Sequence, residues 1–238
     1  MAAIEHAGGR ATGVRLAGGE VVRADAVVAN IDALHLYRDL LPHPRRRRRT
    51  EAAPRSSSGY VLLLGVEGST PDLAHHNISF SAGSPTEFAE LFERRTPVTD
   101  PTVYVCAASV TDPSAAPPGA DCWFVLVNAP EGAGAMTGYG DHVLEVMARR
   151  GWDLAGRIVH REDRSPADLE SRFRTPGGAI YGTSSNGRAA AFLRPGNRGP
   201  LERLYLCGGS SHPGGGLPLV AISGRIAAEL CAGDLARR

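Results

Sequence analysis

A glycine-rich stretch near the C-terminus constrains the fold of this 238-residue chain more than any other segment. Its sequence predicts a short apolar strand over Leu204–Cys207, a turn over Gly208–Gly216 and an apolar helix from about Leu217 onward. Glycine lets the backbone approach a ligand closely, because it has no Cβ atom. The start of the helix offers unpaired N–H groups and a positive dipole end. The stretch therefore predicts a site for a cofactor that carries an oxyanion or an electron-rich ring.

The common phosphate-binding and nucleophile motifs do not fit this stretch. It lacks the Lys-Ser/Thr pair of the P-loop and the GxGxxG spacing of dinucleotide-binding turns, and residues 209–212 are no G-x-S-x-G elbow. Ser210 and Ser211 have no visible base, and no carboxylate lies near His212 in the sequence. We therefore assign no catalytic residue, and expect His212 to shape the loop at least as much as to transfer a proton.

The sequence GGSSHPGGGLP at residues 208–218, followed by Ser223-Gly224, closely resembles the C-terminal signature of the phytoene desaturase family of FAD-dependent oxidoreductases. The resemblance implies that the start of the turn lies by the pyrophosphate and ribityl chain. It also implies that backbone N–H groups of Gly216–Val220 face the pyrimidine edge of the flavin. The cofactor-binding residues implied in this way are Gly208, Gly209, Ser210, Gly215, Gly216, Leu217, Pro218 and Val220.

Other segments resemble the second half of the same family. They are residues 13–30 (GVRLAGGEVVRADAVVAN), Pro176–Gly182 and Phe192–Arg198. The family's N-terminal dinucleotide-binding unit has no counterpart here, so we expect Met1 to begin inside a fold. The implied fold is mixed α/β. Residues 1–30 and 153–238 would form part of a Rossmann-type FAD domain, and residues 31–152 a substrate domain with a mainly antiparallel sheet and helices.

Local patterns predict the individual elements. Ala17-Gly18-Gly19 indicates a hairpin turn, and the continuous apolar run of Ala24–Asn30 predicts a strand buried on both faces, beside the Leu204–Cys207 strand. Ser84 and Glu87 predict a helix opened by a capping box. The Ser84 helix is predicted to reach about Arg94. Further strands are predicted over 58–67, 77–81, 102–108, 121–128 and 157–164. Further helices are predicted over 32–41 with Asp32 as N-cap, from Ser165 onward, and over 141–150 with an inward face of Val143, Leu144 and Met147.

Composition excludes several classes of function. A net charge of +1 gives no reason to expect nucleic-acid binding. The four cysteines show no C-x-x-C pair, and the eight histidines form no metal pattern. His75 and His76 would point different ways on any regular element, and a polar loop is the favoured interpretation. No apolar run is long enough to span a membrane, and no signal peptide opens the chain. We therefore expect a cytoplasmic protein.

Five consecutive arginines, Arg45–Arg49, leave three interpretations open. A solvated loop over His43–Ser58 is favoured by the nearly neutral overall charge. The alternatives are a nucleic-acid-binding arm and a peripheral contact with an anionic membrane. The resemblance ranks the membrane contact above nucleic acid, because the substrates of the resembled family reside in lipid.

The resemblance implies FAD-dependent dehydrogenation of a long isoprenoid or carotenoid polyene, with a quinone or dioxygen reoxidising the flavin. Related members isomerise or oxygenate such chains, and the sequence does not separate these outcomes. The alternative is a non-catalytic fragment, or one subunit of a split flavoenzyme whose partner is a separate N-terminal FAD-binding half.

Overall fold

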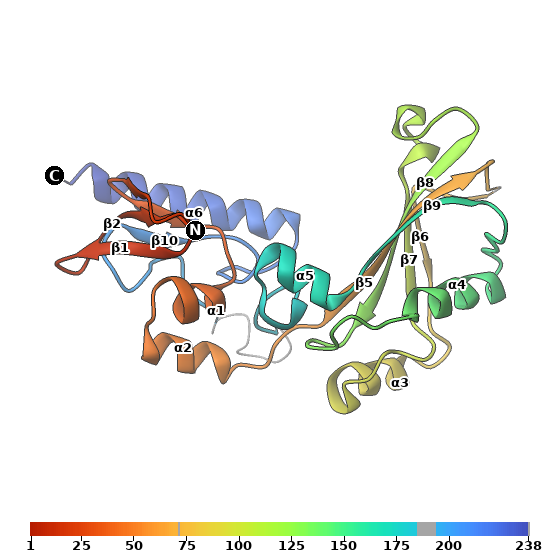
Figure 1. Ribbon diagram of the computed structural model, residues 1–238, viewed down its shortest axis with the longest axis horizontal. Coiled ribbons are helices and arrows are strands. Elements are labelled where there is room, and N and C mark those ends of the chain that lie inside the picture. Colours follow the sequence, from red (N-terminus) through yellow and green to blue (C-terminus); the bar gives the residue numbers. More distant parts are fainter. Residues whose placement is uncertain (71, 185–193, 238) are drawn as a thin grey trace. The chain divides into compact units, whose positions relative to one another are not determined.

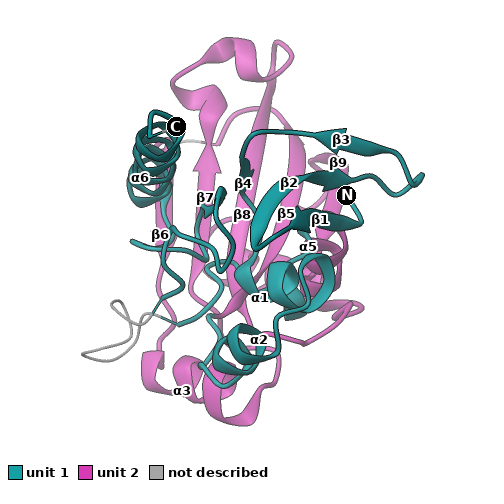
Figure 2. Cartoon of the chain, turned by 90° about the vertical axis from the view of Figure 1, so that its left-hand side faces the viewer, with its two compact units in different colours: residues 1–56, 172–238 teal, residues 57–171 magenta. Residues whose placement is uncertain are grey.

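The chain divides into two compact units, which Figure 2 shows in different colours. The computed structural model describes residues 1–70, 72–184 and 194–237. Unit 1 combines Met1–Ser56 with Arg172–Arg238, and unit 2 is the continuous segment Ser57–Ser171. The described residues form helices, antiparallel sheets and one parallel strand pair, so the mixed α/β class is confirmed.

The units do not coincide with the predicted segments 1–30 plus 153–238 and 31–152. Leu36 and Tyr37, which follow the first strands, are fully buried in the core of unit 1. Strand β9 (Ile158–Arg164) pairs instead with a strand of unit 2. Contacts between distant segments set these boundaries, and local sequence patterns do not reveal such contacts. Which unit holds a cofactor or a substrate stays a prediction.

Unit 1 contains two small sheets. Its strands are β1 (Ala3–Ala7), β2 (Arg10–Arg15), β3 (Val21–Arg23), β4 (Val27–Ala29) and β10 (Leu204–Leu206). The first three form an antiparallel meander. The predicted hairpin joins β2 to β3, and the N–H of Leu16 donates to the carbonyl of Glu20 at 2.8 Å. β4 and β10 pair in parallel, with Val27 opposite Leu204, so the predicted pairing of these strands is confirmed.

The predicted burial of both faces of β4 is wrong. Val27 and Ala29 are 7% and 3% exposed, whereas Val28 between them is 49% exposed. Successive side chains of a strand point to opposite faces, and in the described chain only the face that carries Val27 and Ala29 is covered. An apolar run therefore marks a strand without showing how many of its faces are covered in this chain.

The helices of unit 1 flank this strand pair (Figure 1). Asp32 caps the first one, as predicted, because its Oδ1 accepts from the N–H of Leu34 at 2.8 Å. The helical segments are α1 (Ala33–His35), a π-helical turn (Leu36–Leu40), α2 (Pro44–Glu51), a 3₁₀ turn (Pro176–Gly178) and α6 (Leu217–Leu235). Among the described helices, not one has the length and apolar composition that a membrane crossing requires.

Helix α2 corrects the predicted loop over His43–Ser58. Pro44 occupies the first turn, where a missing N–H costs nothing. His43 Nδ1 accepts from the N–H of Arg46 at 3.3 Å, and arginine itself favours helix. Thr50 is the buried residue of this helix, so the arginine run lies on a helix that is mostly exposed to solvent.

Unit 2 is built on a five-stranded antiparallel sheet with strand order β6-β7-β8-β5-β9. The strands not yet given are β5 (Ser58–Glu67), β6 (His76–Ser79), β7 (Val103–Ala107) and β8 (Ala120–Ala129). Its helical segments are α3 (Ser84–Ala89), a π-helical turn (Glu90–Arg94), 3₁₀ turns at Ala108–Val110 and Pro113–Ala115, and α4 (Tyr139–Arg149). Helix α5 (Pro166–Phe173) crosses the boundary between the units.

One face of this sheet packs against α4. Trp123, Val125 and Val127 alternate along β8 toward this core, where they meet Val143 and Met147. The predicted inward face of α4 is thus confirmed for these two helix residues.

The predicted capping box at Ser84 is wrong. The N-cap of α3 is Gly83. The carboxylate of Glu87 instead accepts from the N–H and the hydroxyl of Thr102, at 3.2 and 2.7 Å. Glu87 is only 5% exposed, because this tertiary contact draws it inward. By contrast, the predicted helix start at Ser165 is confirmed, since Ser165 and Asp168 exchange hydrogen bonds at the beginning of α5.

Candidate functional site

The glycine turn joins β10 to α6 in unit 1, as the sequence predicts. Its backbone takes positive φ values at Gly208 (104°), Gly214 (139°) and Gly216 (96°). Residues with a side chain rarely adopt these conformations. The positions of the glycines are therefore set by the path of the chain from the strand to the helix.

Ser210 fixes the first part of the turn to the connection between β4 and α1. Its hydroxyl accepts from the N–H of Ala33 at 3.1 Å and donates to the carbonyl of Ile31 at 3.2 Å. The side chain is buried. Ser210 thus positions the turn through the backbone of the neighbouring strand, and its predicted contact with a cofactor is untested.

Asn197 fixes the second part of the turn. Its amide nitrogen donates to the carbonyls of Leu206 and His212, at 3.0 and 2.9 Å, and to the hydroxyl of Ser223 at 3.1 Å. The Ser223 hydroxyl in turn accepts from the N–H of Gly208 at 3.2 Å. The sequence placed Asn197 in a family-like segment but gave it no role. Only the tertiary structure shows that it links β10, the turn and α6.

Arg194, in the family-like segment Phe192–Arg198, is buried beneath the turn. Its Nη1 donates to the carbonyls of Tyr181 and Gly209, each at 2.9 Å. Burial lowers the pKa of the Arg194 guanidinium from its ordinary value. This cation therefore holds two backbone segments together. Phe192 and Leu193, predicted in the same segment, lie outside the described residues.

Gly215 and Gly182 allow the segment around Tyr181 to lie against the turn. A Cβ atom at Gly215 would lie within 2 Å of the Tyr181 ring. One at Gly182 would lie 2.6 Å from the Cβ of Ser210. These positions require glycine because two chain segments meet there. Tyr181 and Gly182 of the family-like segment Pro176–Gly182 thus lie against the turn.

The N-terminus of α6 differs from the rest of the turn because it is open. Apart from Gly216 itself and its two chain neighbours, no described residue has an atom within 4 Å of a Cβ atom built on Gly216. Leu217 is 88% exposed, and Leu219 is 40% exposed. The N–H groups of these two leucines have no acceptor within the helix, because they belong to its first turn.

Two residues of Gly216–Val220 cannot donate to a ligand, although the resemblance implied that their N–H groups face the flavin. Pro218 has no N–H, and the N–H of Val220 donates to the carbonyl of Gly216 at 2.9 Å inside the helix. Within the first turn of α6, the donors without a helical acceptor are therefore those of Leu217 and Leu219. Together with the positive end of the dipole of a 19-residue helix, they suit a flat, electron-rich ring that approaches Gly216. A flavin fits this surface.

The comparisons with known proteins agree with this geometry. The profile of the flavin-containing amine oxidoreductase family matches residues 1–232. The chain belongs to that family. A flavin is therefore the cofactor class of its family, as the resemblance implied.

Curated relatives are carotenoid enzymes. The chain is 38% identical over 236 residues to a zeta-carotene-forming phytoene desaturase from Myxococcus xanthus, covering 93% of this chain and 45% of the relative. It is 38% identical over 232 residues to hydroxyneurosporene desaturase from Rubrivivax gelatinosus, covering 93% and 44%. It is 34% identical over 242 residues to 4,4'-diapolycopene oxygenase from a Methylomonas species, covering 98% and 49%. The resemblance to carotenoid desaturases is confirmed, and the chain spans about half the length of these relatives.

A solved structure supports the fold. A crystal structure of an oxidoreductase from Methanosarcina mazei matches with a TM-score of 0.61 and 18% identity. The match covers 96% of this chain and 48% of that protein. At this identity the likeness concerns the fold alone.

Proposed function

We propose that this chain forms the flavin-contacting and substrate-contacting part of an FAD-dependent desaturase for long isoprenoid or carotenoid polyenes. The observation that carries the proposal is the open N-terminus of α6. There, the backbone of Gly216 and the N–H groups of Leu217 and Leu219 are accessible in a turn whose other parts are tightly hydrogen-bonded. FAD, when bound, supplies the two-electron acceptor that dehydrogenation of an unactivated hydrocarbon needs.

The residues of the turn have a binding and orienting role in this proposal. The N–H groups of Leu217 and Leu219, with the helix dipole behind them, would stabilise negative charge that develops on the pyrimidine edge of the ring. Asn197, Ser210 and Arg194 hold the turn in one conformation, so these donors are already oriented before the ring arrives. Preorganised donors of this kind favour the charged transition state without a cost of reorganisation.

The unit 2 sheet has a second face, opposite the one that packs against α4, and this face supports the proposal of an apolar substrate. Phe124 and Ile78 are 39% and 54% exposed there. Ile78 pairs with Tyr104 across the strands, and Tyr104 pairs with Leu126. The Tyr104 and Phe124 rings lie 6.5 Å apart in an edge-on arrangement. An exposed apolar and aromatic surface of this kind commonly marks a binding surface, and its chemistry matches that of a hydrocarbon chain.

A fusion protein tests the cofactor and the reaction together. The part of the Myxococcus xanthus phytoene desaturase that this chain does not match would be joined ahead of Met1. The purified fusion is expected to bind flavin and to desaturate a polyene supplied in liposomes. Gly216→Val should abolish flavin binding, because a β-branched residue is strained at φ 96° and its side chain fills the open space.

Gly233→Val is the matched control. Gly233 is exposed near the far end of α6, and a Cβ atom there would meet nothing within 4 Å, so flavin binding should persist. If the fusion with Gly216→Val keeps full flavin occupancy, the cofactor does not bind at this turn. If the unmodified fusion binds flavin but leaves every polyene unchanged, the reaction class is wrong even though the cofactor is right.

A second candidate is one subunit of a split flavoenzyme. Val28 is 49% exposed, and β10 is the only strand that pairs with β4 in the described residues. The outer edge of β10 is bonded to residues 197–199, so the other edge of β4 is the one that could extend into a sheet with a separate dinucleotide-binding polypeptide. The isolated chain is then expected to bind FAD weakly. Stoichiometric flavin in the isolated chain, purified without added cofactor, would contradict this candidate.

Peripheral contact with an anionic membrane is also part of the proposal. Four arginines of α2 are exposed, and one of them pairs with Glu51 at 2.8 Å. Each basic residue near an anionic surface contributes about 1 kcal/mol. Replacing Arg45, Arg48 and Arg49 with glutamine should therefore weaken binding roughly a hundredfold.

Vesicle sedimentation measures this effect. Vesicles of phosphatidylcholine with an equal amount of phosphatidylglycerol serve as the test, and pure phosphatidylcholine as the blank. A control variant carries the same charge change at exposed arginines elsewhere: Arg15, Arg94 and Arg225. Equal loss of binding in both variants would show that α2 has no special role.

A further inference from the structure

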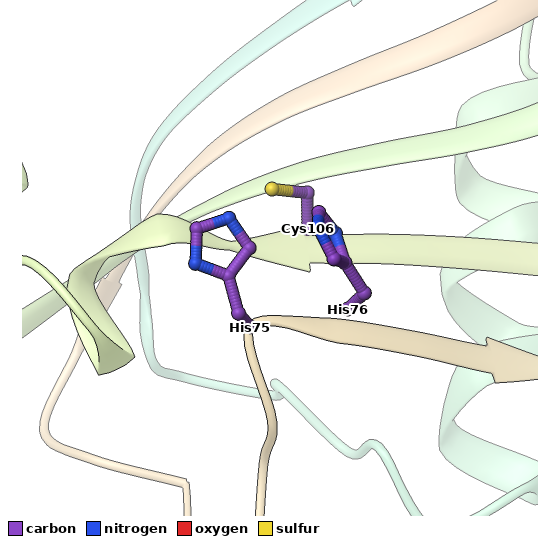
Figure 3. A group of neighbouring side chains, drawn as sticks. All are labelled: His75, His76 and Cys106. Atoms are coloured by element: carbon purple, nitrogen blue, oxygen red, sulfur yellow. The ribbon is translucent and has the colours of Figure 1, made fainter.

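Three potential metal ligands converge at one end of the β6–β7 strand pair in unit 2 (Figure 3). His76 and Cys106 face each other as cross-strand partners. His75 immediately precedes β6, and its carbonyl accepts from the N–H of Ala107 at 2.8 Å. The expected polar loop holds for His75 but is wrong for His76, which begins β6. The ring centroids of the two histidines lie 4.3 Å apart.

The ligand atoms of these side chains are close enough to share one ion. One nitrogen of each imidazole and the Sγ atom of Cys106 all lie within 4.8 Å of one another. Around a tetrahedral zinc ion, with bonds of about 2.0–2.3 Å, neighbouring ligand atoms lie roughly 3.3–3.8 Å apart. Side-chain rotations that shorten the distances between the ligand atoms by about 1 Å would therefore suffice to hold the ion. His76 is exposed, while His75 and Cys106 are half-buried, so an ion can reach the group from solvent.

Hydrogen bonds to the rings orient them for metal binding. The Nδ1 atom of His75 lies 2.5 Å from the hydroxyl of Thr111. That hydroxyl donates its own proton to the carbonyl of Ala108 at 3.3 Å, so it accepts from Nδ1–H of His75. The Nε2 atom of His75 then carries the free lone pair, and Figure 3 shows one ring nitrogen of His75 turned toward the Cys106 sulfur.

His76 has a similar partner. Its Nδ1 atom lies 2.8 Å from the hydroxyl of Tyr104, and the two rings are stacked with centroids 5.9 Å apart. Histidines that bind metals usually engage their second ring nitrogen in this way, which fixes the ring orientation and the tautomer. Both imidazoles of the group therefore have the supporting contacts of a metal ligand.

We propose that His75, His76 and Cys106 form a binding site for a zinc-type divalent cation. Two imidazoles and a thiolate suit Zn²⁺ or Co²⁺ far better than Mg²⁺ or Ca²⁺, which prefer oxygen ligands. Three protein ligands leave a fourth, tetrahedral position for water. Binding releases the thiol proton of Cys106, so affinity rises with pH.

Such a site would reinforce the edge of the sheet. β6 is the outermost strand and pairs only with β7 in the sheet. An ion held by residues from both strands ties this edge to its neighbour. Binding to the folded state alone also stabilises it, in proportion to the logarithm of ion concentration over the dissociation constant. The melting temperature of unit 2 should therefore rise on adding Zn²⁺.

A Co²⁺ titration of the reduced, untagged chain tests the site without any flavin. One equivalent should produce a thiolate-to-cobalt charge-transfer band and the intense d–d bands of tetrahedral geometry. Zn²⁺ should then displace the cobalt. Cys106→Ser should abolish the charge-transfer band, and His75→Gln or His76→Gln should weaken binding at least tenfold. Thr111→Val should weaken it about tenfold through the loss of ring orientation.

Cys122→Ser is the matched control, because Cys122 is also half-buried and lies on the adjacent strand β8. It should leave the spectrum and the affinity unchanged. Tryptophan fluorescence confirms that each variant is folded, since Trp123 and Trp152 both pack in the core of unit 2. Absence of the charge-transfer band in the wild-type chain, or the same affinity in the folded Cys106→Ser variant, would overturn the proposal.

Discussion

Asn197→Asp is the sharpest test of how the glycine turn is held. Asn197 is 6% exposed, and its amide nitrogen donates to the carbonyls of Leu206 and His212. Aspartate has nearly the same shape, but an ionised carboxylate can only accept hydrogen bonds. The substitution therefore removes donors without changing the volume of the side chain.

The expected loss follows from the two carbonyl acceptors. Leaving a buried polar group without its partner costs about 1–3 kcal/mol. Two such groups, together with the burial of a new carboxylate, should lower the free energy of unfolding of unit 1 by at least about 2 kcal/mol. The turn would lose its link between β10 and α6, so its amide hydrogens should also exchange faster.

Urea unfolding followed by far-ultraviolet circular dichroism measures this loss, and hydrogen exchange over residues 204–216 localises it. Tryptophan fluorescence reports on unit 2 alone, because Trp123 and Trp152 both lie in it. Asn30→Asp is the control, since Asn30 is exposed at the end of β4. If Asn197→Asp is no more destabilising than this control, and exchange in the turn is unchanged, the network does not hold the turn.

Three further outcomes are expected. Leu206→Ala should cost about 2–5 kcal/mol in chemical denaturation, because Leu206 is fully buried in β10; a loss under about 1 kcal/mol would contradict its place in the core. Hydrogen bonds from Arg198 and Tyr205 lower the pKa of Asp234 from 3.8 to about 2. Its contribution to stability is therefore complete above pH 4 and lost as the pH falls toward 2. Asp234→Asn should flatten this part of a stability–pH profile, and an unchanged profile would exclude the assignment. In the fusion protein, His212→Ala should keep bound flavin and only slow single-turnover flavin reduction; complete loss of reduction would make His212 essential.

The sequence alone determined those elements that neighbouring residues in the chain specify. The strand at residues 204–206, the turn and the helix that follows were predicted because apolar runs, glycines and a proline in the first helical turn each limit backbone conformation directly. The same holds for the β2–β3 hairpin and for the cap of α1 by Asp32. The resemblance to carotenoid desaturases also needed no structure, because it rests on an ordered series of residues in one stretch.

Only the tertiary structure decided the features that depend on distant residues. The carboxylate of Glu87 accepts a hydrogen bond from Thr102 and does not form the expected capping box. Val28 is exposed although it belongs to an apolar run. Asn197 and Arg194 acquired their roles from carbonyls that other segments bring to them. His75 and His76 met Cys106 because antiparallel pairing places β6 beside β7. In each case the deciding energy comes from burial or hydrogen bonding between segments far apart in the chain, and no local pattern in the sequence encodes those partners.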